Sequence, residues 1–362
     1  MNAMNTLLLA LAPLFGELPP APIEVVSAKP LPAFTARFVR SEGWTGSDGA
    51  YSIPLGPKRT LWLFGDTWIG RVENGKRVQS RMINNSAAWQ DLGDSREPMQ
   101  FFWDDAREAP TAILKPLDGK TWHWPGDGAM VDGKLYLFVH VLRHKEKGAP
   151  GFQFDWFADE LWQIANPEAE PPKWQVKRGW LPDAMHWGNA CYFDGEYLHA
   201  FGSMTTKRPL EAPLGLARIH REKLAKLDLT AWEYRVEGGR WSGKSAGLEP
   251  IIRDGASEFS VQRLRGIDGL VMVNIPLGLG SNIVVRHSSK PEGPWSATVS
   301  AYQVPKQADK VYVYAAKGHS ELATKDGQLI ITYCRNIGEL REHVTRPELY
   351  APQVVELMLK MK

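Results

Sequence analysis

Two aspartates flank a short predicted hairpin near the start of the chain. The segment GSDGAYSIPLGPKRTLWLFGDTW predicts one strand over Tyr51–Leu55, a turn at Gly56–Pro57 and a second strand over Thr60–Phe64. Asp48 precedes the first strand and Asp66 follows the second. Because the strands of a hairpin are antiparallel, both carboxylates lie at one rim. Such a pair can supply a general acid and a general base near neutral pH, although aspartates at these places also cap turns.

The same pattern recurs four more times along the chain. Each copy has a leading polar residue, a short apolar strand, a turn that contains glycine, and a second apolar strand. The copies lie at Gly126–His140, Gly188–Ser203, Ser257–Ile275 and Ser320–Arg335. Their leading polar residues, with that of the first hairpin, are Asp48, Asp127, Asn189, Glu258 and Glu321.

Between the hairpins the chain repeats a third strand and a fourth strand that begins with tryptophan, as in IVVRHSSKPEGPW. Five such units predict an all-β fold, a five-bladed β-propeller with four-stranded blades around a central channel. We expect a single domain over residues 30–362. The strand at Tyr350–Leu359 is expected to close the ring, with Phe34–Val39 as its partner, because closure removes exposed sheet edges.

In a propeller, the leading residues of the innermost strands meet at one mouth of the channel. The residues that end the second strands, which include Asp66, His140 and Arg335, lie at the same mouth. A ring of acids there predicts a pocket, because such charges are costly to desolvate without a use. Histidines and Arg335 would bind hydroxyl groups, and tryptophans would stack on sugar rings. The expected substrate-binding residues are Trp44, Trp68, Asn85, Asp127, His140, His186, Trp187, Asn189, His319, Glu321 and Arg335.

The composition excludes several functions. The chain has 362 residues with 43 basic and 41 acidic side chains, so its charge predicts neither a nucleic-acid nor a membrane partner. No phosphate loop, dinucleotide fingerprint or nucleophile elbow occurs. A metal site from His186, His319 and an acid has no motif support; we expect no cofactor, and a structural cation in the channel stays an open alternative. Cys191 and Cys334 are expected to be buried thiols, with a disulfide left open.

The first residues are typical of a secretory signal. Leu7–Phe15 is apolar but too short to span a membrane, and the breaker segment Glu17–Pro22 follows it. We therefore expect residues 1–25 to be a signal peptide. The mature protein would be a secreted or periplasmic monomer.

Several segments resemble the propeller family catalogued as domain of unknown function 4185, some of whose members are endo-D-arabinanases. They are GWTGSDGAYSIPL, LWLFGDTWIG, INNSAAWQ, GASEFSVQR, IVVRHSSKPEGPW and RPELYAPQVVEL. The resemblance covers most of residues 35–360 and extends in architecture to arabinanases, levanases and invertases. It implies that Asp48 and Asp66 are catalytic. The wider group implies a general acid at Glu258, with Glu321 as the alternative. The group's acid that tunes the general acid is replaced by Asn189.

These observations predict a secreted glycoside hydrolase that cleaves a furanoside-containing, arabinan-like polysaccharide or oligosaccharide. Asp48 would act as the base, and Asp66 or Glu258 as the acid. The alternative is a propeller that binds carbohydrate without cleaving it, and a third possibility is a scaffold for protein contacts. Release of reducing sugar from a panel of glycans separates the first two.

Overall fold

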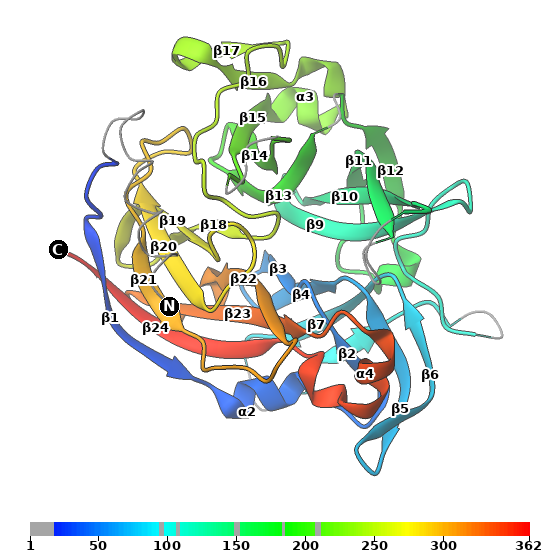
Figure 1. Ribbon diagram of the computed structural model, residues 1–362. Coiled ribbons are helices and arrows are strands. Elements are labelled where there is room, and N and C mark those ends of the chain that lie inside the picture. The colour runs from blue at the N-terminus through cyan, green and yellow to red at the C-terminus, as the bar shows by residue number, and fades with distance from the viewer. Residues whose placement is uncertain (1–17, 94–97, 106–108, 148–152, 183–184, 207–210) are drawn as a thin grey trace.

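The computed structural model describes residues 18–93, 98–105, 109–147, 153–182, 185–206 and 211–362. The predicted all-β class is confirmed: strands dominate, and the helices of these ranges are short (Figure 1). The helices are α2 Pro32–Thr35, α3 Arg221–Ala225 and α4 Leu340–Thr345, with 3-10 turns η1 Ala36–Phe38, η2 Pro171–Lys173, η3 Leu229–Ala231, η4 Glu237–Gly239, η5 Ser320–Leu322 and η6 Pro347–Leu349. The strands are β1 Ile23–Pro30, β2 Glu42–Ser47, β3 Tyr51–Gly56, β4 Arg59–Phe64, β5 Thr67–Glu73, β6 Lys76–Ile83, β7 Ser86–Asp91, β8 Gln100–Phe102, β9 Thr121–Val131, β10 Lys134–His144, β11 Phe154–Ile164, β12 Val176–Trp180, β13 His186–Phe193, β14 Tyr197–Ser203, β15 Leu214–His220, β16 Glu233–Val236, β17 Arg240–Ser242, β18 Ser260–Leu264, β19 Ile267–Asn274, β20 Asn282–Ser288, β21 Val299–Gln303, β22 Tyr312–His319, β23 Gln328–Asn336 and β24 Gln353–Met361.

Five antiparallel sheets are arranged around a common centre (Figure 1). Their strand orders are β3-β4-β7-β8, β9-β10-β11-β12, β13-β14-β15-β16-β17, β18-β19-β20-β21 and β22-β23-β24-β1. The first strand of each sheet lies nearest the centre. Strand β9 contacts both β3 and β13, β13 contacts β18, and β18 contacts β22. The first four predicted hairpins therefore form the inner halves of their sheets. The fifth, at Ser320–Arg335, is wrong in its first strand, because the inner strand β22 ends at His319 and Ser320–Leu322 is the 3-10 turn η5.

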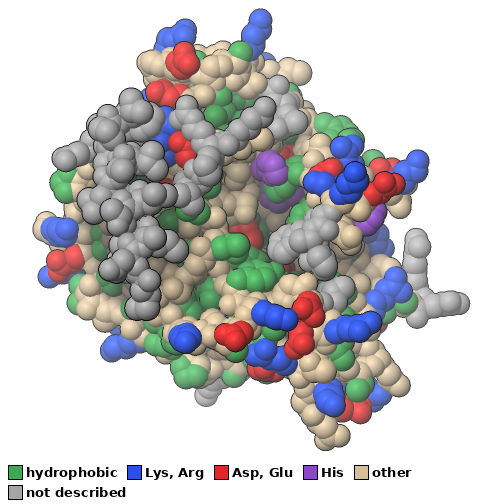
Figure 2. Space-filling view, viewed as in Figure 1, with side chains coloured by type: hydrophobic (Ala, Val, Ile, Leu, Met, Phe, Trp, Pro, Cys, Tyr) green, Lys and Arg blue, Asp and Glu red, His purple; other side chains and the backbone are tan. Residues whose placement is uncertain are grey.

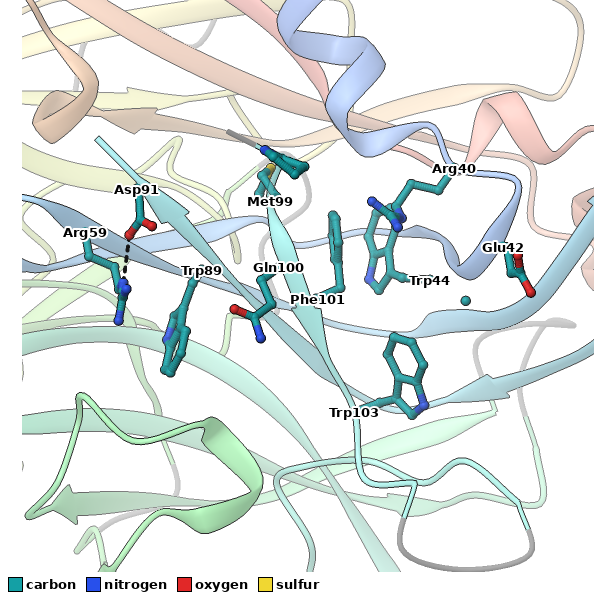
Figure 3. A pocket seen from close by; sticks show the side chains of 12 residues that line it. Arg40, Glu42, Trp44, Arg59, Trp89, Asp91, Met99, Gln100, Phe101 and Trp103 are labelled. Atoms are coloured by element: carbon teal, nitrogen blue, oxygen red, sulfur yellow. Dashed lines mark hydrogen bonds and ion pairs between the residues drawn. The ribbon is translucent and has the colours of Figure 1, made fainter. Parts of the chain in front are cut away.

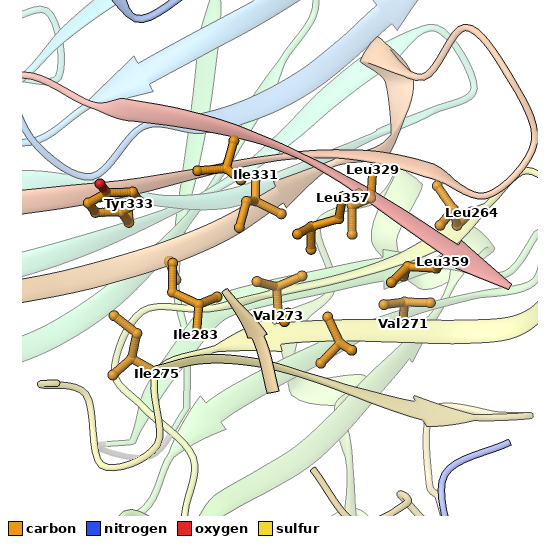
Figure 4. Packing of buried hydrophobic residues seen from close by; sticks show 14 of the residues in the cluster. Leu264, Val271, Val273, Ile275, Ile283, Leu329, Ile331, Tyr333, Leu357 and Leu359 are labelled. Carbon is orange, nitrogen blue, oxygen red and sulfur yellow. The ribbon is translucent and has the colours of Figure 1, made fainter. Parts of the chain in front are cut away.

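Apolar side chains from facing sheets interdigitate to form the core. In the cluster of Figure 4, Val271 and Val273 of β19 face Ile331 of β23 and Leu357 of β24. Alternate residues of a strand point to the same face, so the alternate apolar residues of each strand fill the interfaces between neighbouring sheets. Full burial of one such side chain stabilises the fold by roughly 1.5–3 kcal/mol.

The last sheet is closed by the N-terminal strand. Strand β1 pairs antiparallel with β24, and Ile23 lies opposite Met361. The expected partner, Phe34–Val39, is wrong, because the chain turns into α2 at Pro32 and Phe38 is buried against Trp62. The expected domain start at residue 30 is also too late. The signal-peptide prediction concerns mainly residues 1–17, which lie outside the described residues.

A sixth sheet of three strands was not predicted. Strands β5 and β6 form a hairpin inserted between β4 and β7, and β5 pairs with β2. Its turn is Asn74–Gly75, where both residues have positive φ, as a tight two-residue hairpin requires. The insertion directly follows Asp66 and carries Met82 and Asn84 to the wall described below.

Both cysteines, Cys191 and Cys334, are buried free thiols. In the described parts of the chain, no helix is long and apolar enough to cross a membrane.

Candidate active site

The inner strands, the inserted sheet and α4 surround a cavity of about 550 Å³, which we call the carboxylate cavity. Figure 2 shows hydrophobic, acidic and histidine side chains near the middle of this face. Three of its residues, Asp48, Asp66 and Glu258, carry carboxyl groups. The other lining residues include Gly49, Tyr51, Gly65, Met82, Asn84, Trp122, Trp124, Phe154, Trp156, His140, His186, Asn189, Ser203, Leu277, Leu279, Tyr312, Tyr314, Asn336, His343 and Tyr350.

Asp48 lies between β2 and β3, beside two tyrosines. The Tyr314 hydroxyl donates to Asp48 Oδ2 at 2.5 Å, and Tyr350 is a second hydrogen-bonding phenol. Burial, followed by the negative charges of Asp66 and Glu258, raises the pKa of Asp48 from 3.8 to about 7. Asp48 can therefore hold or release a proton near neutral pH.

Asp66 lies between β4 and β5 in a different environment. Its Oδ1 accepts hydrogen bonds from Trp124 Nε1 at 2.8 Å and Asn84 Nδ2 at 3.4 Å. Burial raises the pKa of Asp66 to about 6, and these two N–H donors oppose the rise. Ser47 Oγ donates to the backbone oxygen of Asp66 at 2.7 Å, so the residue before Asp48 also holds the Asp66 loop.

Glu258 is paired with a buried lysine that the sequence analysis missed. Lys317 Nζ donates to Glu258 Oε1 at 2.9 Å and to Gly49 O at 2.8 Å, and lies 4.2 Å from the centre of the Tyr51 ring. Because Gly49 follows Asp48, this ammonium group ties the Asp48 loop to Glu258. The signal in the sequence was a lysine inside the apolar strand VYVYAAKGH. Across the residues that the structure describes, no group of three or more His, Cys, Asp and Glu could hold a metal ion.

A histidine–aspartate pair lies on another wall. His140 and Asp159 are directly opposite on β10 and β11, and His140 Nδ1 lies 2.7 Å from Asp159 Oδ1. Asp159 also accepts N–H groups from Trp156 and from the Trp187 backbone, so it orients the imidazole. His186 packs against the Trp156 ring, and burial, with a smaller effect of His140, lowers its pKa to about 3. His186 is therefore neutral near pH 7.

The carboxylate cavity contains Asp48, Asp66 and Glu258 of the predicted catalytic residues, and His140, His186 and Asn189 of the predicted binding residues. Asn189 bonds to the protein, accepting from Ser203 N and donating to Ser257 O. The other predicted binding residues do not line it: Trp44, Trp68, Asn85, Asp127, Trp187, His319, Glu321 and Arg335. These eight predictions are corrected here.

Three of the corrected residues are part of the packing between elements. Trp44 and Trp187 are 1% and 2% exposed, and the Trp44 indole stacks at 4.5 Å on Phe101. The Asn85 side chain bonds to Leu114 N and O, which fixes a loop. Trp44, Trp187 and Asn85 are buried, so none of them offers an exposed face to a sugar.

The charged predictions fail for two reasons: alternate residues of a strand face opposite sides, and Glu321 lies in the 3-10 turn η5, after β22, instead of leading a strand. Asp127 lies in the middle of β9, not before it, and accepts Gly128 N and Cys191 N. Glu321 accepts Thr60 Oγ1 from the neighbouring sheet. The remaining partners are Ser52 and Thr332 for His319, His343 for Trp68, and the Glu348 carbonyl for Arg335. The residues missed in their place include Trp122 and Trp124, since β9 begins earlier than predicted.

A glycine beside Asp48 provides a test of this geometry. A Cβ atom at Gly65 would lie 2.5 Å from Asp48 Oδ1, which is the end of a movable side chain. Gly65→Ala is therefore expected to displace the carboxylate and lower turnover by about 10²-fold, with little loss of stability. Thermal unfolding and steady-state rates check this. Gly243→Ala, where no atom lies within 4 Å, is the matched control; equal turnover in both variants would contradict the geometry.

A second depression of about 700 Å³, the outer groove, lies away from these carboxylates (Figure 3). Its Arg59 and Asp91 side chains pair at 2.9 Å, and Arg59 also covers the Trp89 ring. The Phe101 ring is stacked between Trp44 and Arg40. Because Arg59 and Asp91 are paired and these rings are covered, the described residues of the outer groove offer no cluster of buried carboxyl groups like that of the carboxylate cavity, although the groove is larger.

The fold is shared with a solved structure, and two further solved structures have lower similarity. A "putative hydrolase" from Bacteroides ovatus ATCC 8483 has a TM-score of 0.74 and 17% identity, over 92% of this chain and 93% of that one. The GH43_1 enzyme from Xanthomonas citri complexed with xylose has a TM-score of 0.47 and 10% identity, over 89% and 92%. The endo-1,5-alpha-L-arabinanase from Thermotoga petrophila RKU-1 has a TM-score of 0.47 and 10% identity, over 90% and 75%.

A comparison with curated proteins gave no match. The family model that matches spans residues 32–357 and is described as Domain of unknown function (DUF5005). The expected membership of the family of domain of unknown function 4185 is therefore wrong. The chain belongs to the DUF5005 family.

Proposed function

We propose that this protein is a glycoside hydrolase whose carboxylate cavity is the active site. The observation that carries the proposal is the convergence of Asp48, Asp66 and Glu258 on one cavity, where burial raises the pKa of both aspartates. Perturbed carboxyl groups in a cleft are typical of catalytic sites. The aromatic walls formed by Trp122, Trp124 and Trp156 suit a sugar ring.

The architecture that supports this reaction is a five-bladed β-propeller. The five sheets around the common centre are its blades, and the three-stranded sheet is an insertion in the first blade. Closure of the last blade by β1 is consistent with a ring. The domain extends from β1 through β24, and we propose that it acts as a monomer, which size-exclusion chromatography with light scattering tests.

Asp48 is proposed as the general acid and Asp66 as the partner carboxylate. Asp48 has the higher pKa of the two aspartates, and its Tyr314 contact is compatible with a protonated carboxyl group. The two N–H donors on Asp66 favour its ionised form. This order reverses the roles expected from the sequence, in which Asp48 was the base.

The reaction balances with these two groups. Asp48 gives its proton to the glycosidic oxygen as the C1–O bond breaks, so the leaving group departs as an alcohol. Asp66 either removes a proton from the water that attacks C1 or itself bonds to C1 before hydrolysis. Glu258, held by Lys317, adds negative charge near the developing oxocarbenium ion.

The proposed substrate is a furanoside-containing polysaccharide or oligosaccharide. The purified protein should release reducing sugar from at least one member of a panel of arabinans, fructans and bacterial wall glycans. The double variant with Asp48→Asn and Asp66→Asn is the control for contaminating enzymes. Glycan binding by calorimetry without any turnover would contradict hydrolysis and favour the carbohydrate-binding alternative.

We also propose that the protein is exported to the periplasm or beyond. The support is the apolar run Leu7–Phe15. Because Ile23 is fully buried in β1, cleavage is expected before Ile23, earlier than the position near residue 25. N-terminal sequencing of protein from the native host checks this prediction. A mature chain that still begins at Met1 would contradict export by cleavage.

A further inference from the structure

Four polar side chains are hydrogen-bonded in series from the inserted sheet to Asp48. Trp68 Nε1 donates to His343 Nδ1 at 3.3 Å, and His343 Nε2 lies 2.8 Å from Asn336 Oδ1. Asn336 Nδ2 donates to the Tyr314 oxygen at 3.2 Å. The Tyr314 hydroxyl then donates to Asp48 Oδ2 at 2.5 Å. We call this series the Trp68–Asp48 chain.

Two groups that can only donate fix its direction. The indole N–H of Trp68 requires a lone pair on His343 Nδ1, so the neutral imidazole carries its hydrogen on Nε2. The backbone N–H of Ile337 donates to Asn336 Oδ1 at 2.7 Å, which fixes that atom as the amide oxygen. The amide nitrogen must therefore face Tyr314.

The direction of these hydrogen bonds bears on which carboxyl oxygen of Asp48 carries the proton. The Tyr314 oxygen already receives an N–H group from Asn336, so its own hydrogen is directed at Asp48 Oδ2. We propose that the Trp68–Asp48 chain makes Tyr314 a permanent donor to Oδ2 and thereby places the titratable proton of Asp48 on Oδ1. Oδ1 is the atom that faces Gly65, where the missing Cβ leaves room. The inference rests on the proposed function only in identifying this proton as the one given to the substrate.

The surroundings keep the direction constant while Asp48 titrates. Burial, followed by the positive charge of Arg77, lowers the pKa of His343 to about 4. His343 also contacts the Tyr350 ring at 4.5 Å between ring centres, and Arg77 donates to the His343 carbonyl oxygen. The charged groups that face Asp48 are Asp66 and Glu258, and its hydroxyl neighbours are Tyr314 and Tyr350. His343 is therefore neutral across the range in which Asp48 gains or loses its proton.

The tautomer of His343 tests the chain without any substrate. Long-range ¹H–¹⁵N correlation spectra of labelled protein distinguish the two neutral forms, and His343→Gln assigns the signal. We expect a hydrogen on Nε2 alone at every pH from about 5 to about 8. A hydrogen on Nδ1, or on both nitrogens, would overturn the proposal.

Removing one N–H group tests what fixes the tautomer. Trp68→Phe keeps a ring and removes this donor, but Asn336 Oδ1 still accepts from His343 Nε2, so the His343 signal should become a mixture of tautomers only when Asn336→Leu is added. Trp62→Phe is the matched control, because this buried indole donates to Gln90 outside the chain. A shift of the His343 tautomer in the Trp62 variant alone would overturn the assignment.

A thermodynamic cycle tests the last links by following Asp48 with carboxyl ¹³C NMR. Asn336→Leu should move the titration midpoint of Asp48 to higher pH by about 0.5–1, because Tyr314 is no longer held as a donor. In a Tyr314→Phe background the same substitution should have no further effect. Equal shifts in both backgrounds would sink the proposal. Since no readout requires turnover, a failed chain and a failed hydrolase hypothesis give different results.

Discussion

Asp48→Asn should lower kcat by about 10²–10⁴-fold on a natural glycan and by much less on an aryl glycoside. An asparagine cannot give a proton to the glycosidic oxygen, so a poor leaving group cannot depart as an alcohol. A phenolate with a low pKa leaves without that proton. The dependence on the leaving group therefore identifies the acid, provided that the panel supplies a glycan and an aryl glycoside of the same sugar.

Asp66→Asn should lower turnover on both substrates, because the partner carboxylate is needed whatever leaves. The parent enzyme should have a bell-shaped kcat/KM profile with limbs near pH 6 and 7, from pKa values of about 6 for Asp66 and about 7 for Asp48. Asp48→Asn should remove the alkaline limb. Glu321→Gln, outside the carboxylate cavity, is the control. If Asp66→Asn, and not Asp48→Asn, spares aryl glycosides, the two roles are exchanged.

The second prediction with a large expected effect is that Asp48→Asn makes the fold more stable while it lowers activity. The pKa of Asp48 is 3.8 unperturbed and about 7 when folded, so above pH 7 the fold carries the cost of an ionised buried carboxylate. This difference corresponds to about 4 kcal/mol as a ceiling, and partial exposure to the cavity reduces it. Asp48→Asn is expected to stabilise the protein by about 1–4 kcal/mol at pH 8 and by almost nothing near pH 4.

The sign follows from proton binding. Between pH 4 and 7 the folded state holds a proton on Asp48 that the unfolded chain has released, so this contribution to stability falls as the pH rises. The histidines whose pKa values are lowered by desolvation, His186, His319 and His343, act in the opposite direction. The difference in free energy of unfolding between variant and parent, measured by denaturant titration at several pH values, isolates Asp48.

Asp127→Asn is the matched control for this effect. Burial also raises the pKa of Asp127 to about 7, but its two oxygens accept the backbone N–H groups of Gly128 and Cys191. The NH₂ group of an asparagine cannot accept a hydrogen bond, so one of these backbone N–H groups would lose its acceptor. No comparable gain in stability is therefore expected. If the difference in free energy of unfolding between Asp48→Asn and the parent does not change with pH, the raised pKa of Asp48 is contradicted.

The repeated hairpins were readable because alternation and turn chemistry are local. The same locality explains why Asp48 and Asp66 were found, since one hairpin places both at the same end. Asp127 and Glu321 matched the pattern equally well but bond elsewhere. A pattern of polar and apolar residues does not show on which face of a strand a side chain lies when a β-bulge shifts the register. In β9 such a shift lies opposite Leu137–Val139.

The residues around Asp48 were not readable for a different reason. Tyr314 and Lys317 lie on either side of a register shift in β22, where Ala315 has a positive φ. His343 comes from α4, a six-residue helix with no sustained amphipathic period. The positions of these side chains depend on contacts between residues more than 250 positions apart in the chain, such as the contact of Tyr314 with Asp48. The β5–β6 hairpin, in contrast, was signalled by Asn74–Gly75 and could have been predicted.

The pairing of β1 with β24 makes the covered edge of the last sheet depend on the strand that begins at Ile23. Without β1, the row of N–H and C=O groups along β24 would be a bare edge beside the buried Leu357 and Leu359. A protease that cleaves the chain beyond Ile23 would thus leave the edge of β24 unpaired, and the β1 segment of another copy could then pair with it. Because β1 is synthesised long before β24, β1 has no partner until β24 has been made, and chaperones would have to shield its apolar residues until then.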